Sequence, residues 1–324
     1  MSFNILAIGQ SGRLEFEAIL LAASLRHADP GFSGSLIIAE PQPGGKWRGD
    51  PRMSDRTRAI LTDLGAEILP FTARVFGSEY PQGNKIEALS ALPDAPFLFL
   101  DTDTLITGPL SCVPFDFQRP SASMKRENTW PRVELYGPSL TQTWAALYDR
   151  FGLSFEASLD LTQPEDYWQR FLYFNAGWFF HQSPHSFGDR LRAWATDIRE
   201  NPPDALVCQD LFPWLDQITL PLVIHSFGGG RPGPELAPLD GSATCHYRTL
   251  SLLYARESDH TVAMLEAVAR DKAIRPVLRD WEALRLMVYQ NKGHKARALF
   301  DRDLMPPREQ MIRNTLKREG FWIR

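Results

Sequence analysis

The 324-residue sequence has few cysteines and no long apolar segment. Its three cysteines are odd in number and lack C-x-x-C spacing, which argues against a disulfide framework or a zinc site and favours a reducing compartment. Because no apolar run reaches 18 residues, we expect no transmembrane helix. The start, Met-Ser-Phe-Asn, lacks the basic residues of a secretory signal. These absences predict a cytoplasmic protein.

The usual nucleotide-binding fingerprints are also missing. The segment IGQSGR follows the first apolar run and has two glycines, but not the G-x-G-x-x-G spacing of dinucleotide-binding proteins. No P-loop occurs anywhere in the chain. These absences weaken the case for a dehydrogenase or an ATPase.

Charge is unevenly distributed along the chain. From residue 271 to the end there are 13 Lys and Arg against 7 Asp and Glu, a net charge of +6, which leaves −10 for the first 270 residues. The acidic body argues against nucleic acid as a partner. The basic tail, MIRNTLKREGFWIR, mixes aromatic with basic residues. Two readings stay open: a helix packed on its own domain, or a peripheral contact with the anionic inner face of a membrane.

Apolar periodicity predicts an α/β protein. Strand-like runs alternate with amphipathic helical segments in the first third, and Ser54 is a candidate helix cap. This alternation indicates a doubly wound, mainly parallel sheet. From about residue 257 the pattern is helical throughout. The expected strands cover 3–9, 34–40, 66–71, 96–101, 172–180 and 219–225, and the expected helices 13–28, 55–65, 84–92, 189–200 and 208–215.

The stretch FLFLDTDTLITG places Asp101 and Asp103 directly after a strand-like apolar run. Carboxylates at such a place need hydrogen bonds, an ion pair or a metal ion, because an isolated buried charge is costly. The expected location is the carboxyl edge of the sheet, where open α/β sheets bind ligands. A second D-x-D, at Asp301 and Asp303, follows the helical pattern KARALF and is interpreted as a solvated helix end.

Four stretches occur in an order that resembles glycosyltransferases of the GT-A fold, especially family 8: PFLFLDTDTLITGPL, LYFNAGWFF, VCQDLF and a later histidine followed by an aromatic residue. The resemblance covers roughly residues 3 to 250. It implies a Rossmann-like GT-A nucleotide-sugar-binding and catalytic domain at 1–255. The remaining residues, 256–324, would form a helical, basic region packed on it.

The resemblance implies a metal and donor site. Asp101 would contact the donor ribose and the metal, Asp103 would bind the metal, and Lys85 would lie near the donor phosphates. Mn²⁺ or Mg²⁺ suits carboxylate ligands and can hold the charge of a leaving diphosphate as a Lewis acid.

The later motifs imply catalytic and sugar-binding residues. Asn175, in FNAG, would face the donor sugar and reaction centre, with Gly177 beside it at the donor. Gln209 would lie by the anomeric carbon, and Asp210 would help to hold the sugar. Cys208 stands where the family often has another acidic residue, which leaves the identity of the sugar open.

Two histidines are candidates for the third metal ligand. His246, in CHYR, fits the order of motifs and would bring Arg248 to a phosphate. His225 begins HSFGGGRP, which fits the spacing H-x-x-G-x-x-K-P with Arg231 in place of lysine. We favour His246 and keep His225 as the alternative.

The resemblance therefore predicts a metal-dependent hexosyltransferase. It would move a hexose, with retention, from a nucleoside diphosphate sugar to a carbohydrate, a lipid-linked molecule or another hydroxyl acceptor. UDP is implied by kinship, although Gly9 and Gln10 occupy the place of the acidic residue that usually reads uracil. An inverting enzyme would need a carboxylate base, for which Glu165, Asp166 and Asp240 are candidates.

Two features leave further alternatives open. The aromatic stretch 130–178 would form either an acceptor wall or core. The departures after the first strand and at Cys208 allow a non-catalytic nucleotide-sugar or carbohydrate-binding protein on the same fold. A nucleotidyltransferase is a third possibility, for which GQSGR offers only a short nucleotide loop.

Overall fold

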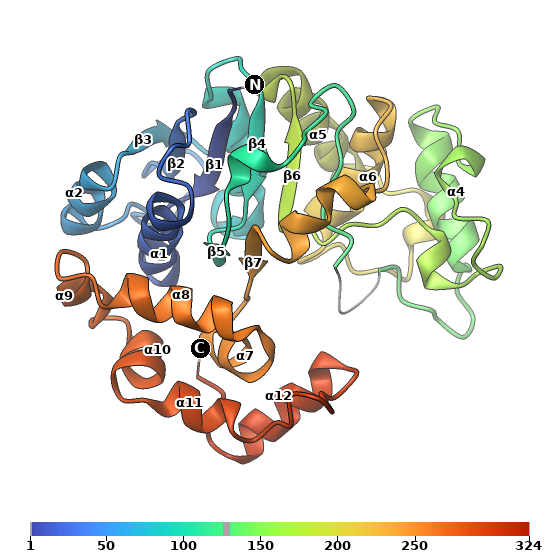
Figure 1. Ribbon diagram of the computed structural model, residues 1–324. Coiled ribbons are helices and arrows are strands. Elements are labelled where there is room, and N and C mark those ends of the chain that lie inside the picture. The colour runs from blue at the N-terminus through green and yellow to red at the C-terminus, as the bar shows by residue number, and fades with distance from the viewer. Residues whose placement is uncertain (1, 126–129, 324) are drawn as a thin grey trace.

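The computed structural model describes residues 2–125 and 130–323. A five-stranded sheet forms its centre, in the order β3-β2-β1-β4-β6 (Figure 1). Strands β1 to β4 run parallel, whereas β6 pairs antiparallel with β4. The predicted mainly parallel sheet is therefore confirmed. Its strands are β1 (Asn4–Ile8), β2 (Leu36–Pro41), β3 (Ala66–Phe71), β4 (Phe97–Leu100) and β6 (Trp178–His181).

Helices cover both faces of this sheet. The predicted cap of the second helix is confirmed, because the Ser54 hydroxyl accepts a hydrogen bond from the Thr57 backbone N–H. The helices are α1 (Arg13–Ala28), α2 (Asp55–Asp63), α3 (Asn84–Glu87), α4 (Leu140–Arg150), α5 (Pro184–Glu200), α6 (Leu215–Ser226), α7 (Leu250–Arg256), α8 (Asp259–Ala269), α9 (Arg275–Leu278), α10 (Glu282–Leu284), α11 (Lys292–Arg297) and α12 (Glu309–Arg318).

The two faces of the sheet belong to separate hydrophobic clusters. Along β4, Leu98 and Leu100 enter one cluster, whereas Phe97 and Phe99 enter the other, as the period-two alternation of a strand requires. Because helices bury both sets, the strand appears in the sequence as an uninterrupted apolar run. The carboxylates that follow it therefore begin where this burial ends.

The C-terminal helices share a core with the sheet. Leu265, Leu284 and Leu316 lie in the same cluster as the buried residues of α1, and α8 contacts α1. In Figure 1 these helices, in orange and red, lie below α1. Because the two parts share one cluster, the structure draws no division at residue 255, and that boundary stays a prediction.

The basic tail packs its apolar side on the protein. Ile312 and Leu316 of α12 are buried, and the ring of Trp322 lies 5.5 Å from the Arg313 guanidinium and 5.9 Å from the Lys317 ammonium. Arg324, one of the basic residues of the tail, lies outside the described residues. Across the described residues, we find no helix with the length and apolar character needed to span a bilayer.

The strand expected at 219–225 is wrong, because this segment is part of helix α6. Its residues from Ile218 to Ile224 are all buried, so the segment is apolar on every side. Such a run shows neither a period of two nor one of 3.6, and periodicity alone cannot separate a buried strand from a buried helix. The short helix expected at 208–215 is also wrong, since α6 begins only at Leu215. Pro213 disfavours helical geometry at the residue before it.

The strand expected at 172–180 is correct only in its last part. The ladder with β4 covers 178–181, and residues 172–177 lie outside it. Ala176 has a positive φ of 55°, which is incompatible with an extended strand. The segment therefore turns before it enters the sheet, and this turn forms part of the site.

Candidate functional site

A pocket of about 370 Å³ opens at the carboxyl ends of β1 and β4. Ile8, the last residue of β1, lines it, as do Asp101 and Asp103 just beyond β4. Thr102, between the two carboxylates, donates a hydrogen bond from its hydroxyl to the carbonyl of Ile8 at 2.7 Å. The D-x-D turn is thus tied to the neighbouring strand, at the edge where open α/β sheets bind ligands.

Asp101 and Asp103 meet His246 at this pocket. The antiparallel pairing of β5 (Thr104–Ile106) with β7 (Thr244–His246) sets His246 opposite Thr104. The His246 Nε2 lies 3.1 Å from Asp103 Oδ1 and 3.8 Å from Asp101 Oδ2. One possible ligand atom from each of the three residues lies within 4.8 Å of the others. Two carboxylates and an imidazole are a donor set that fits Mn²⁺ well and Mg²⁺ less well.

The electrostatics of these residues also fit a bound cation. Burial would raise the pKa of Asp103, but His246 and Arg13 outweigh it and lower that pKa. Burial would lower the pKa of His246, but Asp103 outweighs it and raises that pKa. Without a metal, the carboxylate of Asp103 thus favours the protonated form of His246. A divalent ion would replace this proton, since imidazole must be neutral to bind a metal.

Gly177 makes room for His246. A Cβ atom at position 177 would overlap the Nδ1 of His246, so only glycine fits there. The Gly177 carbonyl accepts a hydrogen bond from the Asp101 N–H at 2.8 Å, and its N–H donates to Asn175 Oδ1 at 2.7 Å. Asn175 itself lines the pocket. The FNAG turn therefore packs its backbone against both the D-x-D turn and the histidine.

A buried cation, Lys85, joins two carboxylates of the pocket. Its Nζ lies 2.8 Å from Asp101 Oδ1 and 3.3 Å from Asp216 Oδ2. The Tyr80 hydroxyl donates to Asp216 Oδ1 at 2.6 Å and accepts the Asp216 N–H at 3.0 Å. Burial alone would lower the pKa of Lys85, but Asp101 and Asp216 outweigh it and raise that pKa. The pocket therefore holds a fixed positive charge.

Arg13, in the first turn of α1, brings a second cation. Its Nη2 lies 4.0 Å from Asp103 Oδ2, and its Nη1 lies 3.4 Å from Glu17 Oε1. Glu17 is fully buried, and among the described residues neither of its carboxyl oxygens has a hydrogen-bond partner. Burial and the charge of Asp103 raise the pKa of Glu17 well above its usual value. Arg13 thus stands between a pocket carboxylate and a buried acid.

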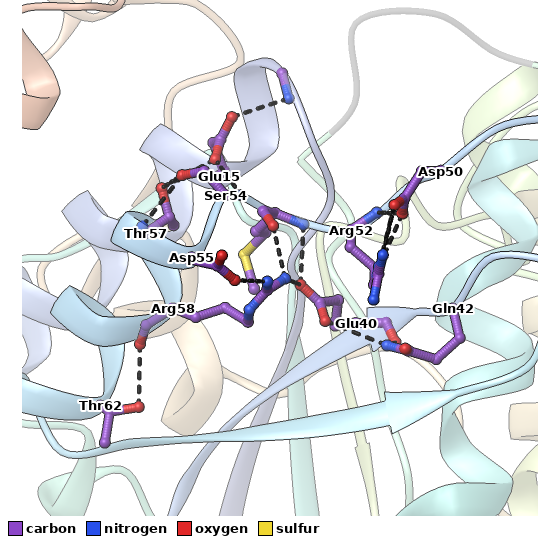
Figure 2. A network of polar contacts seen from close by, with 12 residues as sticks. Glu15, Glu40, Gln42, Asp50, Arg52, Ser54, Asp55, Thr57, Arg58 and Thr62 are labelled. Atoms are coloured by element: carbon purple, nitrogen blue, oxygen red, sulfur yellow. Dashed lines mark hydrogen bonds and ion pairs between the residues drawn. The ribbon is translucent and has the colours of Figure 1, made fainter.

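The segment that contains Met53 packs over the turn after β1. A network of polar contacts, shown in Figure 2, holds this segment in place. Glu40, near the end of β2, accepts hydrogen bonds from the Met53 N–H at 2.9 Å and from Arg58 at 3.0 Å. Met53 in turn lies so close to Gly9 that a Cβ at position 9 would overlap its sulfur and the side chain of Ile38. Gly9 is therefore a packing residue of this turn.

Residues 5–228 match the model of a family described as the Rhodobacterales glycosyltransferase domain. The chain belongs to this glycosyltransferase family. No curated protein matches the sequence. The predicted kinship with glycosyltransferases is thereby confirmed, and it makes the protein a transferase.

Several solved glycosyltransferase structures resemble this glycosyltransferase at low identity. A galactosyltransferase LgtC, in complex with donor and acceptor sugar analogs, is 13% identical over 85% of this chain and 99% of that chain, with a TM-score of 0.49. GlyE from Streptococcus pneumoniae TIGR4 is 13% identical over 89% of this chain and 65% of that chain, with a TM-score of 0.45. The assignment of the glycosyltransferase to its family rests on the sequence match alone.

Gln209 and Asp210 of the glycosyltransferase are not among the described residues that line the pocket. The Gln209 side chain exchanges two hydrogen bonds with the backbone of Arg132, at 2.8 and 2.9 Å. The Asp210 side chain is 78% exposed. Asp216 and Gln217 line the pocket instead. The roles implied for Gln209 and Asp210 stay predictions, without support from this geometry.

The sequence analysis missed Asp216 and Gln217 for a specific reason. They form a second pairing of an acidic residue with glutamine, a few positions after the one that the resemblance selected. Their place in the first turn of α6 becomes visible only when 215–226 is recognised as a helix. Arg13, the last residue of GQSGR, is a further pocket residue that no motif in the sequence indicates.

The structure separates the two candidate histidines. His225 lies near the end of α6, with its ring 5.5 Å from that of Tyr148, whereas the cluster of possible metal ligands contains His246. Arg231, the cation of the HSFGGGRP spacing, donates hydrogen bonds to the carbonyls of Ser158 and Arg170. This motif is thus engaged in structural contacts.

The other residues that were expected to bind the donor sugar nucleotide lie partly in the pocket and partly in the interior of the protein. Gln10 and Lys85 line the pocket, whereas Gly9 packs against Met53. Arg248 forms an ion pair with Glu309 at 3.2 Å and is not among the described lining residues. A phosphate contact by Arg248 stays a prediction that would require this ion pair to rearrange.

Most of the aromatic stretch 130–178 is core rather than acceptor wall. Several of the largest side chains of the stretch are almost fully buried, and a buried ring cannot stack on a sugar. The buried rings include Trp130, Trp144, Tyr148, Tyr173 and Trp178. Tyr136 is the opposite case, at 96% exposure.

Proposed function

We propose that this glycosyltransferase is a metal-dependent hexosyltransferase that uses a nucleoside diphosphate sugar, with UDP as the nucleotide implied by the resemblance. The observation that carries the proposal is the meeting of Asp101, Asp103 and His246 beside the cations Lys85 and Arg13 in one pocket. Three ligands and two positive side chains suit a metal-bound diphosphate.

The residues have separable tasks in this proposal. Asp101, Asp103 and His246 would hold Mn²⁺ or Mg²⁺, which when bound supplies a Lewis acid for the charge of the departing diphosphate. Lys85 orients Asp101 through its 2.8 Å ion pair and adds positive charge to the pocket. Gly177 keeps the space in which His246 lies.

Retention of the anomeric configuration is supported by the state of the carboxylates. Among the described lining residues, the acidic side chains are Asp101, Asp103 and Asp216, and each is already engaged in a hydrogen bond or ion pair. An inverting enzyme would need a free carboxylate base at the acceptor hydroxyl. The candidates for such a base, Glu165, Asp166 and Asp240, are not found among the described lining residues, so we propose a retaining reaction.

The acceptor that we propose is a carbohydrate or a lipid-linked sugar. Exposed apolar side chains occur in the segments 133–136 and 207–212. Two hydrogen bonds between the Gln209 side chain and the Arg132 backbone join these segments. We call these side chains the apolar lip: Val133, Leu135, Tyr136, Val207 and Phe212. Phe212 is followed by Pro213 and Trp214, which line the pocket. An apolar lip beside the donor site suits an acceptor with an apolar portion.

We propose a location in the cytoplasm or at the inner face of the membrane. The few, unpaired cysteines and the basic tail support it. The aromatic residues of the tail pack on the protein, so the proposed membrane contact would depend on its basic side chains.

The proposal is tested by following release of nucleoside diphosphate from a panel of sugar donors with and without Mn²⁺. We expect Mn²⁺-dependent turnover with one donor, and NMR of the product should show the anomer of the donor. Tight donor binding with no turnover, even with a wide acceptor panel, would favour the non-catalytic binding protein. An inverted anomer would contradict the retaining assignment.

A further inference from the structure

Two side-chain carbonyl oxygens in the pocket have no hydrogen-bond partner. Within the described residues, Asn84 Oδ1 and Gln82 Oε1 are buried and unpaired, and both residues line the pocket. Asn84 is only 2% exposed. A buried acceptor without a donor is costly, and native proteins keep few of them. Two such atoms in one pocket indicate a bound group that supplies the missing hydrogens.

The orientation of Asn84 is fixed by its neighbour. Its Nδ2 donates a hydrogen bond to Gln10 Oε1 at 3.0 Å, so Oδ1 is the atom left unpaired. The turn before it is tightly packed, because a Cβ at Gly83 would overlap the ring of Phe76. The following residue is Lys85, the cation at Asp101. The unpaired oxygen of Asn84 is therefore held in place near the charged part of the site.

The chemistry of the unpaired atoms limits what they can bind. Phosphate oxygens are acceptors, so a carbonyl oxygen cannot form a hydrogen bond with the ionised diphosphate. The metal position already has the carboxylates and the imidazole. The group that faces Gln82 and Asn84 must donate hydrogen, as a sugar hydroxyl or a base N–H does.

We propose that Gln82 and Asn84 form a subsite that accepts hydrogen bonds from hydroxyl or N–H groups of the donor, and that this subsite sets which donor binds. The inference rests on the proposed function, because it assumes a nucleotide sugar in this pocket. It assigns Gln82 and Asn84 to donor selection, with Gln10 as the residue that positions Asn84.

The test compares Asn84→Leu and Gln82→Leu with the wild type by calorimetric titration. Each Mn²⁺-loaded protein is titrated with UDP, 2′-deoxy-UDP, UDP-glucose, UDP-galactose, CDP, ADP and GDP. Loss of one buried hydrogen bond should weaken binding of the best ligand about tenfold, which equals about 1.4 kcal/mol. Titration with Mn²⁺ alone should give the same affinity in all three proteins.

The ligand panel separates the possible sources of the hydrogen bond. If ribose supplies it, the wild type should bind 2′-deoxy-UDP about as weakly as the variants bind UDP. If the base supplies it, the variants should lose the preference for one nucleotide. If the transferred sugar supplies it, binding of UDP should be unchanged while that of the UDP-sugar weakens.

A matched control is Gln142→Leu, which removes an amide that accepts the Ser139 N–H at the start of α4. It should lower the melting temperature and leave donor affinity unchanged. The melting temperature of unliganded Gln82→Leu should not fall, because the variant removes an unpaired acceptor, whereas Asn84→Leu also removes the hydrogen bond to Gln10 Oε1. If both pocket variants bind every ligand as the wild type does, the subsite is refuted and the proposed function stands. A wild type that binds Mn²⁺ but no nucleotide would overturn both.

Discussion

The protein contains two D-x-D sequences that differ in every structural respect. Asp101 and Asp103 lie at the end of a buried strand, face a pocket and meet His246. Asp301 and Asp303 lie after α11 on the surface, where Asp301 Oδ1 accepts the Asp303 N–H at 3.0 Å. Only the first pair faces opposed charges and an enclosed space. The sequence D-x-D therefore does not by itself indicate a site. The buried strand before the first pair, and the residues that other segments place next to it, make the difference.

The largest contrast is expected when each pair loses a carboxylate. Asp103→Ala should lower kcat/KM on the order of a hundredfold or more, because the variant removes a proposed metal ligand and a charge at the pocket. Asp303→Ala should leave kcat/KM within a factor of two, since its carboxylate faces solvent. Steady-state kinetics with the best donor measures both. Equal losses would show that the first pair has no special role.

The next contrast concerns His246, the proposed third metal ligand, which among the described residues has no counterpart at the second pair. Gly177→Ala would force the His246 ring to move, because its Cβ would overlap Nδ1. We expect Mn²⁺ affinity to fall about 10- to 100-fold, as when the support of a metal ligand is lost. Gly49→Ala is the control, since a Cβ at Gly49 would meet no atom of the structure within 4 Å. Unchanged Mn²⁺ affinity in Gly177→Ala would remove His246 from the site.

Two exposed apolar side chains, one on the apolar lip and one beside the second pair, extend the comparison. Tyr136, on the apolar lip, and Leu304, next to Asp303, are both exposed. If the lip receives the apolar portion of the acceptor, Tyr136→Ser should raise the KM for an alkyl glycoside acceptor about three- to tenfold, with donor KM unchanged. Leu304→Ser should change neither constant. A KM that does not depend on the alkyl chain length in the wild type would count against the lip.

The smallest effect concerns the acid buried behind the first pair. Burial raises the pKa of Glu17 in the folded protein, so the unfolded chain ionises first as pH rises. At a pH below the pKa that Glu17 has in the unfolded chain, its contribution to folding stability is fully present. This contribution is lost as pH rises towards the higher pKa that Glu17 has in the folded protein. Glu17→Gln should gain stability relative to the wild type as pH rises from 4 to 8, measured by urea unfolding. A stability difference that is constant with pH would contradict the assignment.

The sequence predicted the parallel part of the sheet because its strands are short apolar runs separated by amphipathic helices. The order of motifs in the resembled family led us to expect Asp101, Asp103 and His246 at one site. The structure brings the three residues together, and their binding of a metal stays a prediction. The prediction from sequence failed at helix α6, where the buried, mostly apolar run 218–224 has no distinguishing period. Because this helix was not predicted, Asp216 and Gln217 at its start were not recognised as pocket residues.

Other parts of the site depend on tertiary contacts that leave no local pattern. The local sequence GNKIEAL does not indicate that Lys85 is buried between Asp101 and Asp216. It also does not indicate that Asn84 has an unpaired side-chain oxygen. The exposure of Tyr136 and the burial of Trp144 are likewise products of packing. These features require coordinates, because they depend on which distant segments approach one another.

The most direct test of the central claim is Mn²⁺ binding by the wild type, Asp103→Ala and Asp303→Ala, followed by thermal shift with a panel of nucleoside diphosphate sugars. A ligand at about 100 times its dissociation constant should stabilise the folded protein by about 2.7 kcal/mol. We predict a Mn²⁺-dependent shift with one donor in the wild type and in Asp303→Ala, and none in Asp103→Ala. An equal shift in all three proteins, or a shift that does not require Mn²⁺, would contradict a metal-dependent donor site at the first D-x-D.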